Sequence, residues 1–564
     1  MLKVVIRNII YTILLSIIPF FFGLVLSFLF SRLVPGNPVL AYLPQNFTAE
    51  EYYTALHLLG LDQPLIVQFF RYLSDLFSGN LGISMAIAPG QPVIELLTAR
   101  IPATIEFTIL SIVLGLITGI VLGILSVKVR YRLIKLLIQI LIILGISMSM
   151  FVVAMWAQYT FVYQLGIFSV FGDPFLPSCI LFLLTLFLTT RQVRSNYLKK
   201  SEEKHILSNS MKIIFNLSIL ITSIFLLEVT FGIHGFFDLF MSAIRNSDYW
   251  LVRACVFILI VLPAIILLLS NIFYTIYNYF LEESRSKIIT KYLGRTEQMV
   301  EEGARYDFNT DQTFKDFTLY RLKSPLTIIG LAIVAFSIIV AIFPQILTPL
   351  TLQQVTGIYP GAWDQPSATH PLGQTKFGRD VLGLLAYGVS TSIIVCSLSV
   401  LIGIVIGLSF GYLSKVHRWV KELVLGLMVI LFIVPSIIML FIFLSILGSN
   451  ILVIVSVLAM YMIPGVTLLI SKGNYSFKLT TKKVIAYFPL FMAFNILLFE
   501  AIGFLGFSNP LLVQLGIDIR TARLHLFHAP WASFWPSLAL YVLVMGFFML
   551  HYGLKEPIPI VRRS

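Results

Sequence analysis

Few residues of this chain have types and spacing that could support chemistry, and the first of them are three acids in apolar surroundings. Glu106, Glu228 and Glu500 lie within or near the ends of long apolar runs. Acidic side chains inside a membrane are rare and often mark the route of a solute or proton, so all three are candidates for a substrate pathway that favours a cationic group. Hydrogen bonding between helices near the membrane surface is the alternative explanation.

Motifs for enzymatic chemistry are absent from the sequence. It has no Gly-x-x-x-x-Gly-Lys-Ser/Thr loop, so any ATP must be bound and hydrolysed by a partner, and we expect no cofactor in this chain. No HExxH, Gly-x-Ser-x-Gly or Cys-His metal spacing occurs, and His525 and His528 lack a third ligand. The three cysteines are widely scattered, which favours small buried residues over a disulfide framework. We therefore predict neither an enzyme nor a metal site.

The composition places these residues in a membrane protein. The chain has 564 residues, of which 58% are hydrophobic and only 12% charged. Apolar runs of ~20 residues can cross ~30 Å of hydrocarbon as helices, and these runs do not alternate as barrel strands would. We predict an all-α polytopic membrane protein with twelve spans, near 9–31, 103–126, 133–158, 174–190, 212–232, 254–280, 325–346, 389–413, 422–447, 450–470, 484–506 and 533–553.

The basic residues divide the connecting loops into two sets. Most of the 39 lysines and arginines fall in alternate loops, including the charged segment 281–324. The positive-inside rule then places both termini and this segment in the cytoplasm, in a multi-pass protein of the plasma membrane. The net charge of +13 is therefore mainly a signal of topology and gives no reason to expect nucleic acid as a partner.

Two sets of glycines indicate an internal repeat. The second predicted span of each half carries three glycines at four-residue intervals, which places them on one helix face where a neighbouring backbone can approach; they are Gly115, Gly119, Gly123, Gly403, Gly407 and Gly411. Glu228 and Glu500 occupy matching places in the fifth spans. We predict two six-helix bundles with parallel topology, over 1–280 and 325–564, joined by a cytoplasmic linker at 281–324.

Short stretches along both halves resemble one family of transporters. The first half is similar to the B-type permease of oligopeptide, dipeptide and nickel ABC importers, at PGNP (35–38), LGLDQP (59–64), QFFRYL (68–73), GNLGIS (79–84), RIPATIE (100–106), EVTF (228–231) and NSDY (246–249). The second half is similar to the C-type partner, at HPLG (370–373), GRDVL (378–382), FLG (504–506), APW (529–531) and FWP (534–536). The resemblance implies two type I ABC permease bundles, here fused in one chain.

The resemblance also assigns the polar segments outside the spans. It implies external segments at 32–102 and 347–388 that dock an extracytoplasmic substrate-binding protein, the second of which contains His370, Gly373, Gly378, Arg379 and Asp380. The family usually has Thr-Asp after His-Pro-Leu-Gly, whereas Gln374 and Thr375 stand here, so any role of that aspartate is absent. These residues could also simply shape a turn and close a local ion pair, and the two readings are compatible.

The loops that should receive the ATPase are shorter than the resemblance requires. In the family, a cytoplasmic EAA…G segment forms the coupling helix between the fourth and fifth spans. Here only a remnant stands at 191–212, and a still shorter loop at 471–483. The candidate coupling residues are Glu202, Glu203, Lys204, His205, Lys478, Lys482 and Lys483.

The resemblance implies the permease of an ABC importer for peptides or similar small solutes. Its expected partners are two ABC ATPase subunits on the cytoplasmic side, an extracytoplasmic substrate-binding protein and membrane lipid. Two other functions remain open at this point. An ion-coupled secondary transporter would need acids near the midplane and broken helices, and no ATPase. A degenerate permease would act only as a regulatory or assembly partner, which the shortened loops favour.

Overall fold

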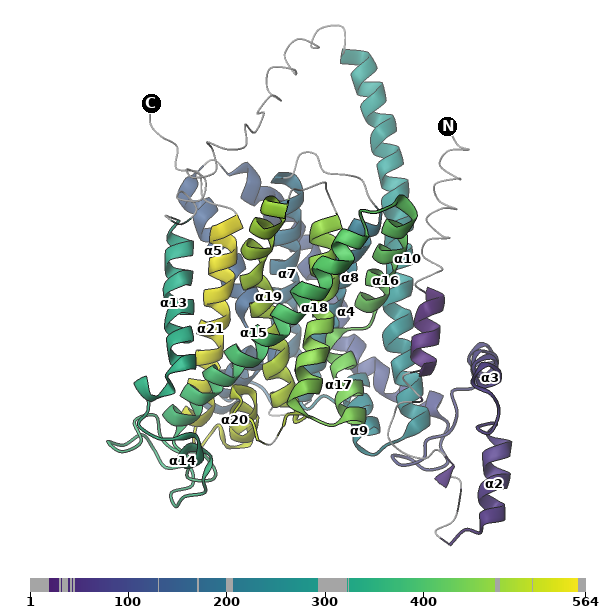
Figure 1. The fold of residues 1–564 in the computed structure, drawn as a ribbon, viewed down its shortest axis with the longest axis horizontal. Coiled ribbons are helices and arrows are strands. Elements are labelled where there is room, and N and C mark those ends of the chain that lie inside the picture. The colour runs from purple at the N-terminus through teal and green to yellow at the C-terminus, as the bar shows by residue number, and fades with distance from the viewer. Residues whose placement is uncertain are drawn as a thin grey trace.

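The fold is described from a computed structural model of the chain. The structure describes residues 20–29, 32, 39–40, 43, 46–129, 131–169, 172–198, 206–292, 322, 324–471, 477–509 and 511–555. Over these residues the protein is a bundle of long helices that run side by side (Figure 1). This confirms the prediction of an all-α polytopic membrane protein.

Nine helices in the described part of the chain are long and apolar enough to cross a membrane. They lie at nine of the twelve predicted spans and are α4 (Val93–Lys128), α7 (Phe175–Leu198), α8 (Ile206–Phe231), α10 (Tyr249–Tyr292), α13 (Pro325–Ile342), α15 (Val381–Leu413), α18 (Ile451–Ser471), α19 (Phe477–Leu505) and α21 (Trp531–Lys555). At the first predicted span only the short helix Phe20–Leu29 is described.

The third predicted span of each half is broken into two helices. In the first half α5 (Arg132–Ser147) meets α6 (Met150–Ala157) at a bend of 91°, and α6 continues as the π-helix η2 (Gln158–Gln164). In the second half α16 (Arg418–Ile433) is followed by α17 (Ser436–Leu447). Pro435 explains the second break, since a proline disfavours helical backbone at the residue before it. We predicted one continuous span at each place.

The repeated glycines join the second span of each half to the fourth. A Cβ atom added at Gly119 of α4 would lie 2.7 Å from the Thr189 Cβ of α7, and one added at Gly407 of α15 would lie 2.7 Å from the Val466 Cβ of α18. The other four glycines, one turn before or after these, lie equally close to α7 or α18. Cβ atoms added there would be 2.6–2.8 Å from the nearest atom of that helix, at Gly115, Gly123, Gly403 and Gly411. Only glycine allows the two backbones to come this close.

Shorter helices collect at one end of the bundle. Both halves have one after the fifth span, α9 (Phe236–Arg245) and α20 (Leu515–Ala522), and we call this the α9/α20 end (Figure 1). The first half adds α2 (Ala49–Leu58) and α3 (Leu65–Phe77), whereas the second adds α14 (Leu352–Thr356). At the opposite end α10 continues as helix to Tyr292, so the beginning of the predicted linker prolongs the sixth span.

Candidate functional site

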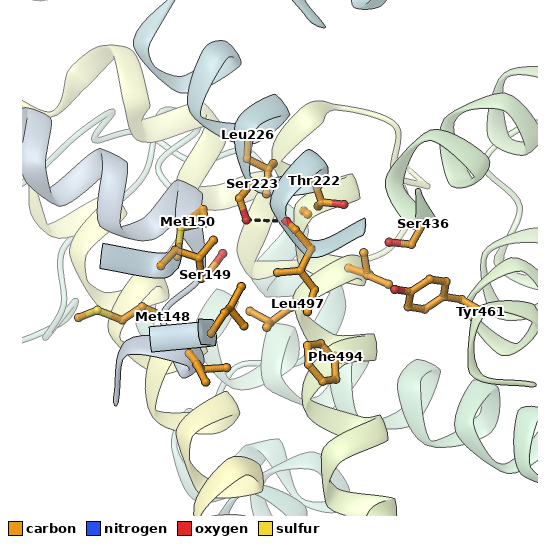
Figure 2. A pocket seen from close by; sticks show the side chains of 16 residues that line it. Met148, Ser149, Met150, Thr222, Ser223, Leu226, Ser436, Tyr461, Phe494 and Leu497 are labelled. Carbon is orange, nitrogen blue, oxygen red and sulfur yellow. Dashed lines mark hydrogen bonds between the residues drawn. The ribbon is translucent and has the colours of Figure 1, made fainter. Parts of the chain in front are cut away.

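A cavity of about 80 Å³ lies where the two halves meet, at the level of the broken spans (Figure 2). Met148, Ser149 and Met150 reach it from the break between α5 and α6, and Ser436 reaches it from the start of α17. Irregular backbone is tolerated at membrane depth only where protein buries it or where it lines a cavity. The rest of the lining comes from α5, α7, α8, α18 and α19, at Ile146, Leu184, Leu188, Ile219, Thr222, Ser223, Leu226, Tyr461, Phe494, Leu497, Leu498 and Ala501.

The lining is mainly apolar and carries a few hydroxyl groups. The Thr222 hydroxyl is buried and has no hydrogen-bond partner among the described residues. Ser218, one turn earlier on α8, accepts hydrogen bonds from the backbone N–H of Ser436 at 3.3 Å and from the Tyr461 hydroxyl at 3.4 Å. These bonds tie α8 of the first half to α17 and α18 of the second. The site could therefore hold a small, largely apolar group and one hydrogen-bonding atom.

Aromatic pairs close the contact between the halves around this cavity. Phe151 stacks on Phe504 with ring centroids 4.6 Å apart. Phe225 meets Phe441 edge to face at 5.3 Å, and Phe215 meets Phe494 edge to face at 5.1 Å. Each pair joins one residue from the first half to one from the second, so widening the cavity requires these rings to separate.

Glu228 and Glu500 perform matching structural tasks at the α9/α20 end. Both are fully buried. Glu228 accepts hydrogen bonds from the Thr104 hydroxyl of α4 and from the backbone N–H groups of Phe237 and Asp238, at 2.8 and 3.1 Å. The Glu228 carboxylate thus ties the first turn of α9 to the long helices α4 and α8. A negatively charged group is favoured at this place, the N-terminus of a helix.

The Glu500 contacts repeat this pattern in the second half. Its carboxylate accepts hydrogen bonds from the Ser392 hydroxyl of α15 and, at 2.6 Å, from the backbone N–H of Gly516 in α20. Neither Glu228 nor Glu500 lines the cavity, whereas Glu106 is exposed on α4. None of the three acids lines the cavity, and a direct role for them in a substrate pathway stays a prediction.

Two arginines join the short helix of each half to the fifth span of the other. Arg245, at the end of α9, donates to the Leu505 carbonyl of α19 at 3.3 Å. Arg523, which follows α20, donates to the Thr230 carbonyl of α8 at 2.6 Å. Positive side chains are favoured at helix C-termini, where carbonyl groups lack partners within the helix. We call these two contacts the arginine clasp, and they close the interface between the halves beyond the cavity.

The short helix α20 also carries a buried acid outside the spans. Asp518 is 9% exposed, and its Oδ2 atom has no hydrogen-bond partner in the described part of the structure. Burial raises the pKa of this carboxyl group to about 8, and the nearby charge of Glu500 acts in the same direction. Its counterpart Asp238 in α9 is partly exposed and lies 3.0 Å from the His234 ring.

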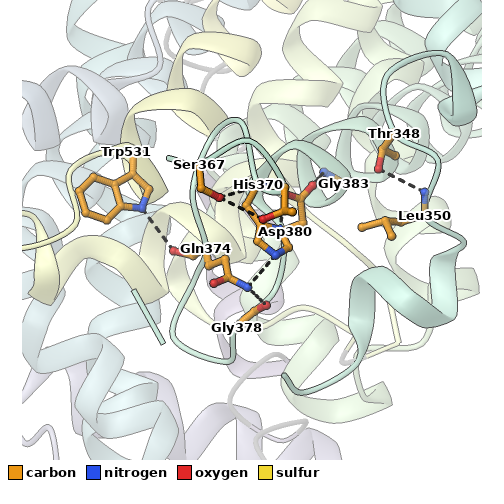
Figure 3. A network of polar contacts seen from close by, with 10 residues as sticks. Thr348, Leu350, Ser367, His370, Gln374, Gly378, Asp380, Gly383 and Trp531 are labelled. Carbon is orange, nitrogen blue, oxygen red and sulfur yellow. Dashed lines mark hydrogen bonds and ion pairs between the residues drawn. The ribbon is translucent and has the colours of Figure 1, made fainter. Parts of the chain in front are cut away.

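The predicted external segment of the second half folds into a compact turn before α15 (Figure 3). Asp380 caps α15 by accepting from the Gly383 N–H at 2.7 Å, and its other oxygen lies 3.1 Å from His370 Nδ1. Gln374 donates to the Gly378 carbonyl at 2.8 Å. Gly373 and Gly378 have φ angles of +79° and +67°, which side chains disfavour.

Arg379 points elsewhere in this turn. Its Nε atom donates to the Gly357 carbonyl at 2.9 Å, so the local ion pair joins Asp380 to His370 and leaves Arg379 out. These contacts explain why the residue types occur here, and docking of a partner at this turn stays a prediction.

Known protein families match the first part of the chain. Residues 1–108 match the model for the N-terminal part of the membrane component of binding-protein-dependent transport systems, and residues 111–212 match the model for the inner membrane component of such systems.

Three relatives are also similar to this chain. The dipeptide transport system permease protein DppB of Lactococcus lactis is 25% identical, over 46% of this chain and 93% of its own length. The glutathione transport system permease protein GsiD of Pectobacterium atrosepticum is 23% identical, over 43% of this chain and 89% of its own length. The dipeptide transport system permease protein DppC of Alkalihalophilus pseudofirmus is 25% identical, over 42% of this chain and 85% of its own length.

This chain is a permease of an ABC importer. That conclusion confirms the function expected from the sequence. Transport permeases of this kind are membrane components and carry no enzyme chemistry of their own, and they work with ATPase subunits and a substrate-binding protein. Each of the three relatives matches most of its own length to less than half of the permease.

The residues proposed to couple the permease to an ATPase are only partly visible. Glu202, Glu203, Lys204 and His205 lie outside the described residues. Lys478 and Lys482 fall in the first turns of α19, and only Lys483 has a described, half-buried side chain. The coupling role of all seven residues stays a prediction.

Sequence reasoning missed the residues that line the cavity and those of the arginine clasp. Pro435 was an available signal for the break next to Ser436, because proline interrupts helices. Nothing comparable marks Met148 and Ser149, whose backbones are extended. Arg245 and Arg523 meet backbone carbonyls of the opposite half, a pairing that no local pattern reveals.

Proposed function

We propose that this permease moves peptides or similar small solutes through the interface between its two halves. The observation that carries the proposal is the cavity between the halves, which is lined by residues from both broken spans. The relatives named for dipeptide and glutathione transport support peptides as the substrate class. The mainly apolar lining with isolated hydroxyl groups suits peptide side chains and backbone, which offer both apolar surface and hydrogen-bonding groups.

Thiol labelling at Thr222 tests this route directly. Thr222→Cys is nearly isosteric and places a thiol in the cavity, in a background where Cys179, Cys255 and Cys396 are replaced by serine or alanine. We expect uptake of labelled di- and oligopeptides to survive the substitution and to be blocked by a small methanethiosulfonate reagent, with peptide slowing the reaction. Val405→Cys is the matched control, since Val405 is 65% exposed on the outer face of α15. Full uptake by the Thr222→Cys variant after complete labelling of its thiol would contradict the route.

We also propose that the permease combines a B-type half, 1–280, with a C-type half, 325–564, through a cytoplasmic linker at 281–324. Three features support two related halves and recur in the same order. They are the contacts of the repeated glycines of α4 and α15 with α7 and α18, which we call the glycine joints, the buried glutamates, and the broken third spans. The relatives, each matched by less than half of the chain, are consistent with two permease-sized units. Expressing 1–280 and 325–564 as separate chains should restore uptake only when both are present.

The proposed topology has both termini and the linker in the cytoplasm, with the α9/α20 end outside. The supporting observation is the concentration of lysine and arginine in the loops of the opposite end. A reporter inserted after Thr310 that is active only in the cytoplasm should be active. An external reporter active at that position would invert the topology and move the binding-protein contacts to the wrong side.

The proposed partners are two ATPase subunits on the cytoplasmic side and a substrate-binding protein at the external segments 32–102 and 347–388. Purification of the tagged permease from its host membranes should recover both kinds of partner. Replacing Lys478, Lys482 and Lys483 by glutamate should release the ATPases while leaving the binding protein attached. Transport that persists without any ATPase would favour an ion-coupled carrier, and neither partners nor transport would favour a regulatory protein.

A further inference from the structure

A second cavity, of about 170 Å³, lies in the first half, between α3 and the start of α10. Its charged lining residues are Arg32, Arg71, Arg253 and Asp75, so the charge is net positive. We call this cavity the arginine pocket. Neither the peptide route nor the contact between the halves uses it.

Several polar atoms around the arginine pocket are buried without partners. Gln68 and Trp250 are each 8% exposed and Arg253 is 6% exposed. The Trp250 indole Nε1, the Arg32 Nε and the Gln68 Oε1 have no hydrogen-bond partner among the residues that the structure describes. Proteins rarely leave buried polar atoms unpaired, so three such atoms around one hollow point to an occupant.

The unpaired groups define the chemistry of that occupant. Indole and guanidinium groups only donate hydrogen bonds, so the occupant must present acceptor oxygens, and the excess of arginine favours an anion. Arg253 is held in place between the rings of Tyr72 and Trp250, 4.6 and 4.8 Å from their centroids, and its Nη2 atom is 3.5 Å from Asp75. Gln68 Oε1 adds one acceptor, which suits a hydroxyl or ammonium group beside the anion.

The position of α3 indicates where the anion comes from. This helix is seen almost end on in Figure 1, so it lies across the spans. Ile66, Phe70 and Phe77 are 64–85% exposed and share one face, whereas the pocket residues Gln68 and Asp75 lie on the opposite face. A helix with this distribution lies in the membrane interface, with its apolar face at the acyl boundary and its polar face at the depth of the lipid headgroups.

We propose that the arginine pocket binds the phosphate group of a membrane phospholipid headgroup. The phosphate oxygens accept hydrogen bonds from Trp250, Arg32 and Arg253, and the hydroxyl or ammonium group of the headgroup meets Gln68. The bound lipid fastens α3 to the outer end of α10 and so fixes the external segment of the first half at the membrane surface.

Trp250→Phe tests the proposal because it keeps an aromatic ring at this position and removes one unpaired donor. The purified full chain is freed of lipid and titrated with dihexanoyl phosphatidylglycerol and dihexanoyl phosphatidylethanolamine, with binding followed by native mass spectrometry. We expect one short-chain phospholipid per wild-type chain and affinity about tenfold lower for Trp250→Phe, the effect of losing a hydrogen bond to a charged group. Arg32→Gln should weaken binding at least as much.

Trp363→Phe is the control, since Trp363 lies at the same end of the molecule and outside the pocket. In lipid-free protein, Trp250→Phe removes a buried donor without a partner but also the indole that packs on Arg253, so its stability is measured beside its affinity. Phospholipid should then raise the melting temperature of the wild type more than that of the variant. Equal phospholipid affinity in both proteins would overturn the proposal. Inorganic phosphate binding as tightly as the phospholipids would make this a site for soluble oxyanions and would overturn the lipid assignment.

Discussion

The two halves of the permease are alike inside the bundle and different at its α9/α20 end. Inside, glycines of α4 and α15 meet α7 and α18 at the same spacing, and Thr190 and Thr467 each donate at 3.2 Å to a carbonyl of those glycines, at Gly119 and Gly407. At the α9/α20 end the halves differ. The first half carries α2, α3 and the arginine pocket, whereas the second half carries α14 and the turn around His370. Close backbone packing thus restricts the interior, while the exposed segments are free to differ.

Valine substitutions at the glycine joints should cause the largest losses of stability, and the losses should be equal in the two halves. Gly119→Val and Gly407→Val each force a side chain against a backbone carbonyl, 2.8 Å away at Leu186 and 3.0 Å at Ile463. We expect each variant to lose about 3 kcal/mol or more of stability, enough to abolish folded protein in the membrane. Fluorescence size-exclusion chromatography of a tagged chain measures this.

Gly426→Ala is the control for the glycine joints, because a Cβ atom there would meet nothing within 4 Å. It should behave as the wild type. If only one of the two valine variants misfolds, the joints are not equivalent and the repeat does not extend to packing.

Alanine substitutions of the buried glutamates should cause the next largest losses of stability. Glu228→Ala leaves two backbone N–H groups of α9 unpaired, and Glu500→Ala leaves one in α20. Each donor left unpaired costs about 1–3 kcal/mol, so Glu228→Ala should lower the melting temperature more than Glu500→Ala. Glu106→Ala, at an exposed position, should leave it unchanged. Loss of peptide uptake at full stability would instead assign Glu228 or Glu500 to the substrate pathway.

Removing either bond of the arginine clasp should loosen the contact between the halves. The effect should be smaller than that of the glutamate variants and should differ between the two arginines. Arg523→Met removes the shorter bond, 2.6 Å against 3.3 Å for Arg245, and should therefore have the larger effect. A hydrogen bond from a charged group contributes about 1.5–3 kcal/mol, so its loss should make the thiol of a Thr222→Cys background about tenfold or more reactive toward thiol reagents. Arg100→Met, which removes an exposed bond within the first half, should leave that reactivity unchanged. Unchanged reactivity in both clasp variants would show that the clasp does not control access to the cavity.

The short helix α20 should make the stability of the permease depend on pH. The Asp518 carboxyl has a pKa of about 8 in the folded protein, above its ordinary value of 3.8. Because the unfolded chain releases this proton first, the stabilising effect of the protonated group is lost as the pH rises through about 8. Between pH 7 and 9 the wild type should lose about 1.4 kcal/mol, or about 1 °C in a chain of this length, relative to Asp518→Asn. If the melting temperatures of Asp518→Asn and the wild type depend on pH in the same way, the assignment is refuted.

The sequence located nine of the twelve predicted spans as the described structure has them, but it gave no account of the breaks in the third spans or of what the spans enclose. Apolar length and the placement of arginine and lysine are local signals, and every predicted span with a described structure contains helix. Glycine spacing identified a contact face on α4 and α15 but gave no information about which helix would cover it. Glu228 and Glu500 stood out as buried acids, yet their purpose depends on α9 and α20, which are too short to be recognised. The cavity and the clasp join residues hundreds of positions apart, so no pattern within a window could reveal them.

The order of the contacts along the chain has a consequence for biogenesis. The joint between α4 and α7 and the bonds of Glu228 lie wholly before Pro325, so both can form while the ribosome is still making the second half. Phe151, Phe215 and Phe225 then face lipid until Phe504, Phe494 and Phe441 are inserted to cover them. A nascent chain stalled between the halves would therefore show the membrane an aromatic surface on an otherwise finished unit, which is a feature that quality-control proteases could recognise.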